Sequence, residues 1–134
     1  MEILALYKSM VRPVAEFAAP AYHSLLNASQ TGMLEQLQAR AMKIIFGWNV
    51  SYRTALLETN TPRLEERRQQ LVEKFAQKCV KEERFKSWFP LNFEAPYDTR
   101  RREKYKISRG RTQRFYRNPL SYMRKYLNNA AGDS

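Results

Sequence analysis

Side chains that usually build a catalytic centre are scarce in this sequence. One histidine, His23, and one cysteine, Cys79, are present. Within one chain this excludes an internal disulfide, a multi-histidine metal site and a cysteine-based zinc site. Aspartate occurs only at Asp98 and Asp133, and adjacent glutamates on a helix diverge by about 100°, so they do not share a metal ion. We therefore expect no metal site, no cofactor and no enzymatic activity.

Cys79 and His23 leave one catalytic alternative, a thiol nucleophile paired with an imidazole base. Cys79, however, ends the apolar stripe of a predicted helix. A buried and inert thiol is the usual occupant of such a position. We expect Cys79 to belong to the core.

Glycine and proline are also scarce, with four and six residues. An all-β chain needs a turn every 8 to 12 residues, so this scarcity favours a few long helices. The glycines are scattered singly, which excludes a glycine-rich phosphate-binding loop. No run of about 18 apolar residues and no leader-like N-terminus are present, so we expect an intracellular protein of the nucleus or cytoplasm that does not enter a membrane.

Acidic side chains are few, and the resulting positive charge is unevenly distributed. The chain has 24 Lys and Arg against 13 Asp and Glu, a net charge of +11. Residues 1–96 carry a surplus of three positive charges, whereas residues 97–127 carry a surplus of nine. This concentration favours a polyanionic partner, first a nucleic-acid backbone and second an anionic membrane surface. A basic tail that is only solvated is the remaining alternative.

The N-terminal part has the apolar spacing of a helix, interrupted by two prolines. Apolar residues recur every three or four positions over residues 3–26. Pro13 and Pro20 lack a backbone donor, so we expect two short helices or one kinked helix. The residues of this apolar stripe, which we expect to face the core, are Ile3, Leu6 or Tyr7, Met10, Val14, Phe17, Ala21 and Leu25.

Three further helices are predicted before residue 82. A polar stretch at residues 27–32 supplies the N-cap of a helix over residues 33–46, and Gly47 ends that helix in a left-handed conformation. Ser51 caps a short helix that reaches Leu57. Thr61 and Pro62 are the expected N-cap and first residue of a long helix that runs to Lys81. The apolar residues expected to face the core are Met33, Leu34, Leu37, Ala41, Ile44 and Ile45 in the first of these helices and Leu64, Leu71, Val72, Phe75 and Cys79 in the last.

The helical pattern breaks between residues 85 and 96, around Trp88, Phe89 and Pro90. We interpret this stretch as an aromatic-anchored connector and place a domain boundary in it. The predicted domains are therefore residues 1–89, a small helical bundle, and residues 90–134, a basic and partly irregular extension. We also expect a short amphipathic helix over residues 120–127 and frayed residues from 128 to 134.

The extension interleaves basic and aromatic side chains. Its candidate nucleic-acid-binding residues are Arg100, Arg101, Arg102, Lys104, Lys106, Arg109, Arg111, Arg114 and Arg117. Arginine forks pair bidentately with phosphates, and aromatic faces stack unpaired bases. For the aromatic residues two interpretations stay open. In the first, their faces contact unpaired bases. In the second, Trp88, Phe89, Phe115, Tyr122 and Tyr126 anchor a loosely wrapped segment to the helices.

Several blocks of sequence resemble one known family. The blocks are residues 6–13 (LYKSMVRP), 16–22 (EFAAPAY), 34–45 (LEQLQARAMKII), 64–68 (LEERR), 75–79 (FAQKC) and 111–123 (RTQRFYRNPLSYM). Together they are similar to the region after the polymerase palm in reverse transcriptases of non-LTR (LINE-like) retrotransposons. The similarity spans nearly the whole chain.

The resemblance implies a helical thumb and the region after it, which grip the primer and template behind the palm. The parent protein would be an RNA-directed DNA polymerase. The paired aspartates of its palm are missing from this sequence. We therefore expect a non-catalytic fragment that binds the backbone of an RNA–DNA hybrid or duplex. The alternative is a structural or interaction fragment without independent activity, which functions only against the palm of a larger reverse transcriptase.

Overall fold

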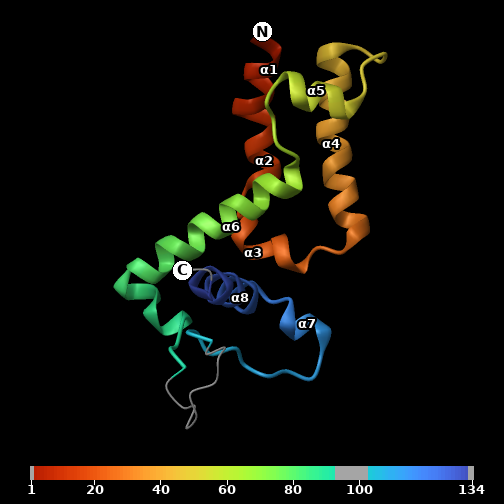
Figure 1. Ribbon diagram of the computed structural model, residues 1–134. Coiled ribbons are helices and arrows are strands. Elements are labelled where there is room, and N and C mark those ends of the chain that lie inside the picture. The colour runs from red at the N-terminus through yellow and green to blue at the C-terminus, as the bar shows by residue number, and fades with distance from the viewer. Residues whose placement is uncertain (1, 93–102, 133–134) are drawn as a thin grey trace. The chain divides into compact units, whose positions relative to one another are not determined.

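The computed structural model describes residues 2–92 and 103–132, and these residues are mainly helical (Figure 1). No strand forms in these two ranges, and the only bridge is an isolated one between Leu91 and Tyr105. The predicted mainly-α fold class is confirmed. In chain order the helices are α1 (Glu2–Leu6), the π-helix η1 (Tyr7–Val11), α2 (Arg12–Glu16), α3 (Ala19–Tyr22), the 3₁₀ helix η2 (His23–Leu25), α4 (Ala28–Phe46), α5 (Tyr52–Glu58), α6 (Leu64–Lys81), the 3₁₀ helix η3 (Glu83–Trp88), α7 (Gln113–Tyr116) and α8 (Pro119–Gly132).

The chain forms two compact units. The N-terminal unit consists of Met1–Ala19 and Leu26–Gln70, and the C-terminal unit of Pro20–Leu25 and Leu71–Ser134. The division by contacts thus runs through α6, whereas the sequence suggested a boundary between residues 89 and 90. Residues 71–89 pack with the basic C-terminal part of the chain.

Pro13 explains the π-turn in the first helix. Proline lacks an N–H and its ring crowds the carbonyl four residues earlier, so a regular α-helical turn does not fit. The turn before it widens, and the Arg12 N–H donates to the Tyr7 carbonyl, five residues back. Helix α2 then ends at Glu16, and Ala18, at φ +53°, turns the chain before Pro20. Both prolines interrupt the helix as expected.

The local helix ends agree with the sequence patterns in most places. Asn27 and Gln30 form a capping box at the start of α4, Gly47 follows α4 at φ +87°, and the Ser51 side chain caps α5. The predicted start at residue 33 is wrong, because the cap is the first residue of the polar stretch and residues 28–32 are already helical. The predicted cap at Thr61 is wrong, because α6 starts at Leu64 and its first amides are bound by a side chain from α4. The predicted fraying from residue 128 is also wrong as far as the structure describes it, since α8 continues to Gly132.

Several apolar side chains of the N-terminal unit are exposed, contrary to the prediction. Most expected core residues of α1, η1 and α2 lie on the surface, with Val14 77% exposed and Phe17, just after α2, 81% exposed. Tyr7, the alternative to Leu6, is buried as expected. On α4, Met33, Leu37 and Ile44 are exposed as well. The buried positions of α4 are instead Glu35, Gln38 and Met42. The helix faces were assigned wrongly because polar contacts between helices, which periodicity does not reveal, determine the orientation of α4.

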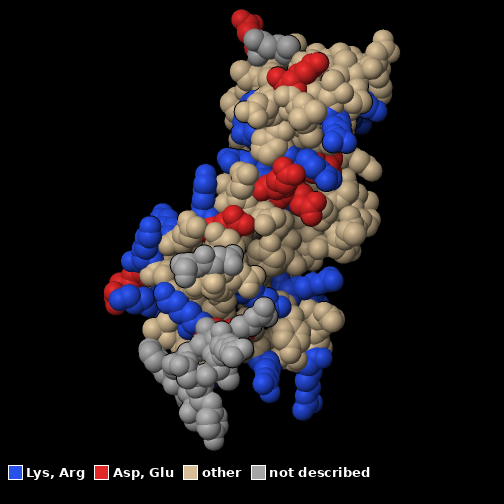
Figure 2. Space-filling model, in the orientation of Figure 1, with Lys and Arg blue, Asp and Glu red and all other residues tan. Residues whose placement is uncertain are grey.

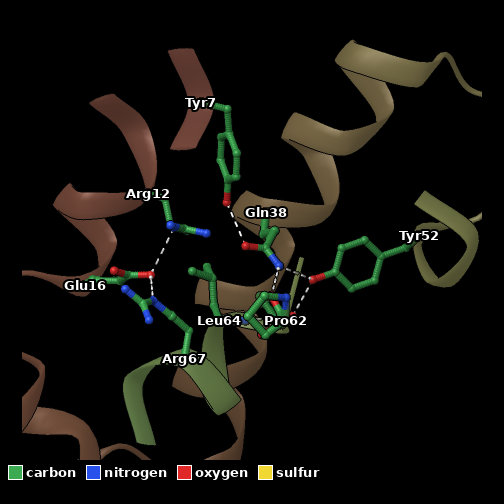
Figure 3. A network of polar contacts seen from close by, with 9 residues as sticks. Tyr7, Arg12, Glu16, Gln38, Tyr52, Pro62, Leu64 and Arg67 are labelled. Carbon is green, nitrogen blue, oxygen red and sulfur yellow. Dashed lines mark hydrogen bonds and ion pairs between the residues drawn. The ribbon is translucent and has the colours of Figure 1, made fainter. Parts of the chain in front are cut away.

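Gln38 is the centre of a buried polar network (Figure 3). Its side-chain oxygen accepts a hydrogen bond from the Tyr7 hydroxyl at 2.8 Å. Its amide nitrogen donates to the Tyr52 hydroxyl and to the Pro62 carbonyl, both at 3.0 Å. The network ties η1, α4, α5 and the segment before α6 together, and every polar atom of the Gln38 side chain has a partner, as burial requires.

Glu35 extends this network and caps α6. Its carboxylate accepts a hydrogen bond from the Tyr52 hydroxyl and is contacted by the Leu64 and Glu65 amides at 3.3 Å each. Arg63 adds an ion pair at 3.6 Å. A carboxylate is favourable at this place because the first amides of a helix are unpaired and carry a partial positive charge.

The two tyrosines of the network predict a loss of stability in alkali. Burial raises the pKa of Tyr7 to about 12, and burial together with the bond to Glu35 raises the pKa of Tyr52 further. The folded chain therefore holds protons that the unfolded chain loses above its ordinary pKa of about 10. The contribution of these two hydroxyls to the free energy of unfolding should be fully present below pH 10 and should be lost as the pH rises through 12. Urea unfolding between pH 9 and 12 measures this, and Tyr7→Phe should flatten the decline; an unchanged pH profile in this variant would contradict the assignment.

Arg68 is buried among apolar positions of α6. It follows Leu64 and precedes Val72 at four-residue spacing, so it shares the stripe that the helix turns inward. The side chain is fully buried, and none of its three guanidinium nitrogens has a hydrogen-bond partner among the described residues. The core face predicted for this helix did not include Arg68, and the structure corrects this.

The core of the C-terminal unit gathers around α6 and α8. Val72, Ala76 and Cys79 of α6 are fully buried and pack with Phe89, Tyr105 and Met123. Asn118 caps α8 by accepting from the Ser121 amide at 2.8 Å, and Pro119 occupies the first helical position. The predicted role of Cys79 in the core is confirmed.

Candidate nucleic-acid interface

Six of the nine predicted basic residues lie in the part of the chain that the structure describes. They are Lys104, Lys106, Arg109, Arg111, Arg114 and Arg117, and all are exposed. Arg100, Arg101 and Arg102 lie outside the described residues. In Figure 2 basic side chains project at the lower edge of the view, where Figure 1 places the segment that leads to α7. We call residues 104–117 the basic segment.

The start of the basic segment is anchored to the core of the C-terminal unit. Tyr105 is buried and bridges to Leu91, and two backbone hydrogen bonds flank the bridge. The side chain of Asn128, on α8, makes two hydrogen bonds to Tyr105. Its Oδ1 accepts from the Tyr105 N–H at 2.8 Å, and its Nδ2 donates to the Tyr105 carbonyl at 3.0 Å. The Asn128 side chain therefore replaces the missing neighbour strand at this position.

Arg124 holds two backbone carbonyls beside that anchor. Its guanidinium donates twice to the Trp88 carbonyl, at 2.9 and 2.6 Å, and once to the Lys106 carbonyl at 3.3 Å. Burial lowers the pKa of Arg124. This arginine, although it belongs to the basic C-terminal region, is occupied within the protein and positions other residues.

Gly110 and Thr112 set the path of the segment into α7. A Cβ atom at Gly110 would lie 2.1 Å from Cδ1 of Phe115, so only glycine permits this close approach. The Thr112 side chain then caps α7 through the Phe115 amide. Arg114 lies on α7 and Arg117 at its C-cap. Arg114 and Arg117 therefore extend from a helix and its cap, and not from an irregular tail.

Four arginines of the segment form no ion pair with any acidic residue that the structure describes. Within the described residues no ion pair involves Arg109, Arg111, Arg114 or Arg117. Lys104 instead lies over the Tyr105 ring, 5.6 Å from its centroid. Exposed guanidinium groups with no internal carboxylate are free to pair with external anions, and their fork matches phosphate oxygens.

The aromatic residues of this region are mostly anchors. Phe89 and Tyr105 are buried and pack edge to face at 6.1 Å. Tyr122 packs against the His23 ring, and the Tyr126 hydroxyl accepts a hydrogen bond from Gln77. Phe115 remains 37% exposed. Anchoring thus describes most of these rings better than base stacking.

Cys79 and His23, the two residues of the catalytic alternative, both belong to the C-terminal unit. Cys79 is buried, and burial raises the pKa of its thiol, so the reactive thiolate is disfavoured. The His23 ring contacts Tyr122. Over residues 2–92 and 103–132 no three His, Cys, Asp or Glu side chains gather as a metal site would require.

Comparisons of the chain with family models, curated proteins and solved structures found no match. No helix in the described ranges is both long and apolar enough to span a membrane.

Proposed function

We propose that this chain binds the phosphate backbone of nucleic acids through its basic segment and performs no chemistry on them. The observation that carries the proposal is the row of four exposed arginines, Arg109, Arg111, Arg114 and Arg117, which have no described acidic partner. Anchoring by Arg124 and Asn128 supports the proposal further, because a held backbone loses less conformational entropy on binding than a free tail does.

The proposed partner is an RNA–DNA hybrid or a duplex, bound with little regard to sequence. Contacts to phosphates fix a protein on the backbone but carry no base information. The resemblance to the region behind the palm of non-LTR reverse transcriptases agrees with such a gripping role. Arg100, Arg101 and Arg102 belong to the same proposed surface on the basis of sequence alone.

Salt dependence tests this function directly. Each phosphate neutralised on duplex DNA contributes about 0.9 to the slope of log K against log salt concentration. We expect the double variant Arg114→Ala/Arg117→Ala to bind duplexes and hybrids more weakly and to reduce the slope by up to about two units. Fluorescence anisotropy over a range of salt concentrations measures both quantities.

Arg40→Ala/Arg53→Ala is the matched control, since it removes the same charge from exposed positions of the N-terminal unit. It should change affinity and slope less. Equal effects of the two double variants would show that binding depends on the net charge of the chain and not on the position of these arginines. An unchanged slope in Arg114→Ala/Arg117→Ala would show that the basic segment is only solvated.

A second function is favoured by the exposed apolar side chains of the N-terminal unit. They are Ile3, Leu6, Met10 and Val14 on α1, η1 and α2, Phe17 just after α2, and Met33, Leu37 and Ile44 on α4. Large exposed apolar surface often marks an interface. In this alternative the chain acts only as a structural part of a larger reverse transcriptase, with some of these side chains against the palm. Self-association in sedimentation experiments without nucleic-acid binding would favour it.

A further inference from the structure

A hollow of about 400 Å³ lies in the C-terminal unit, at the start of the basic segment. This volume is within the range of sites that hold small ligands. Apolar atoms and two lysines line it, and the lining includes Lys86, Phe89, Pro90, Leu91, Lys104 and Tyr105. The hollow therefore combines an apolar wall with cationic groups.

The wall is fixed before any ligand arrives. Asn128 binds both the N–H and the carbonyl of Tyr105. The bridge between Leu91 and Tyr105 joins the two chain segments. Arg124 binds the carbonyls of Trp88 and Lys106, the residues just outside the hollow on each segment. A preformed hollow binds its ligand more tightly because no ordering has to accompany binding.

The two cations differ in their availability. Lys86 forms an ion pair with Glu83 at 2.5 Å. Lys104 makes no described ion pair, and its ammonium lies over the Tyr105 ring. The hollow thus suits a flat apolar group that carries one negative charge nearby, which is the chemistry of a nucleotide.

We propose that this hollow takes one unpaired base of a single-stranded nucleic acid, with the adjoining phosphate paired to Lys104. The inference rests on the proposed backbone binding and adds a single-stranded stretch with unpaired bases beside the duplex or hybrid. A base within a duplex is stacked and does not reach a recessed wall, where Phe89 and Tyr105 are 4% and 6% exposed. An unpaired base, in contrast, has both faces available.

Two oligonucleotides with equal numbers of phosphates test the proposal on the full chain. One is a short oligothymidylate, and the other has the same backbone with abasic sites. A base that enters the hollow removes apolar surface from water, at about 25 cal/mol per Å², so oligothymidylate should bind at least about 5-fold more tightly than the abasic strand. Equal affinity of the two would overturn the inference.

Leu91→Arg and Leu37→Arg separate filling of the hollow from added charge. Leu91 lines the hollow and is 43% exposed, whereas Leu37 lies on α4 and is 57% exposed, so neither substitution disrupts a core. Leu91→Arg should remove the preference for oligothymidylate without weakening binding of the abasic strand. Leu37→Arg should retain the preference.

The outcomes distinguish this inference from the proposed function. A preference that persists in Leu91→Arg would place the base elsewhere and overturn the inference, while backbone binding would stand. Failure of both strands, and of duplex DNA, to bind would contradict the proposed function and the inference with it.

Discussion

Arg68→Met should raise the stability of the chain by about 2–4 kcal/mol. A guanidinium that is buried without a partner has lost its hydration and gained no hydrogen bond, and the effective penalty for such an ion amounts to several kcal/mol. Methionine is also unbranched and fits the apolar stripe between Leu64 and Val72. Urea unfolding followed by circular dichroism gives the change in the free energy of unfolding.

Arg67→Met is the control. Arg67 immediately precedes Arg68 on α6, but its guanidinium has a partner, since it donates to Glu16 at 3.2 Å. Loss of this partly buried pair should lower stability only modestly, because Arg12 still pairs with Glu16 at 3.2 Å. A clear loss of stability in Arg68→Met would show that the buried guanidinium has partners in solution, and would contradict the prediction.

Glu35→Gln should lower stability by about 2–4 kcal/mol, although the two side chains have nearly the same shape. The carboxylate faces donors only, from the Tyr52 hydroxyl, the Leu64 and Glu65 amides and the Arg63 guanidinium. The amide group of glutamine turns a donor toward some of these donors and leaves buried groups unpaired. It also removes the negative charge at the start of α6.

Glu65→Gln provides the matched comparison. Glu65 lies in the first turn of the same helix, and its side chain is exposed. This substitution removes the same charge near the same helix end but disturbs no buried contact, so its effect should be small. Equal losses in Glu35→Gln and Glu65→Gln would mean that charge at the helix end, and not the buried carboxylate, determines the stability.

The sequence predicted local features of the fold well and the orientation of helices poorly. The caps at Asn27 and Ser51 and the end of α4 at Gly47 depend on residues three or four positions apart, which a single sequence displays. The buried face of α4 depends on Gln38, whose partner Tyr7 lies 31 residues away. Periodicity could have placed Arg68 correctly, since it occupies the spacing of Leu64 and Val72; its charge led to the opposite assignment.

In the candidate interface, too, the sequence predicted composition and charge but not the long-range contacts. Composition alone revealed the surplus of positive charge and the arginines of the basic segment. Composition did not reveal that the segment is anchored, because the clamp on Tyr105 comes from Asn128, 23 residues further along the chain. It also did not distinguish Arg124, which binds carbonyls of the protein, from arginines that point to solvent. The sequence does not indicate a structural role for Gly110, since its close approach to Phe115 exists only in the folded chain.

The assignment of Pro20–Leu25 to the C-terminal unit has a consequence for the order of folding. The His23 ring packs edge to face on Tyr122, at 5.6 Å, across roughly a hundred residues of intervening chain. Contacts between such distant segments form only after a long loop has closed, at an entropic cost that local helices do not bear. The C-terminal unit should therefore acquire its final packing late. No single cut of the chain separates the two units with their contacts intact, because each unit contains two separate stretches of sequence.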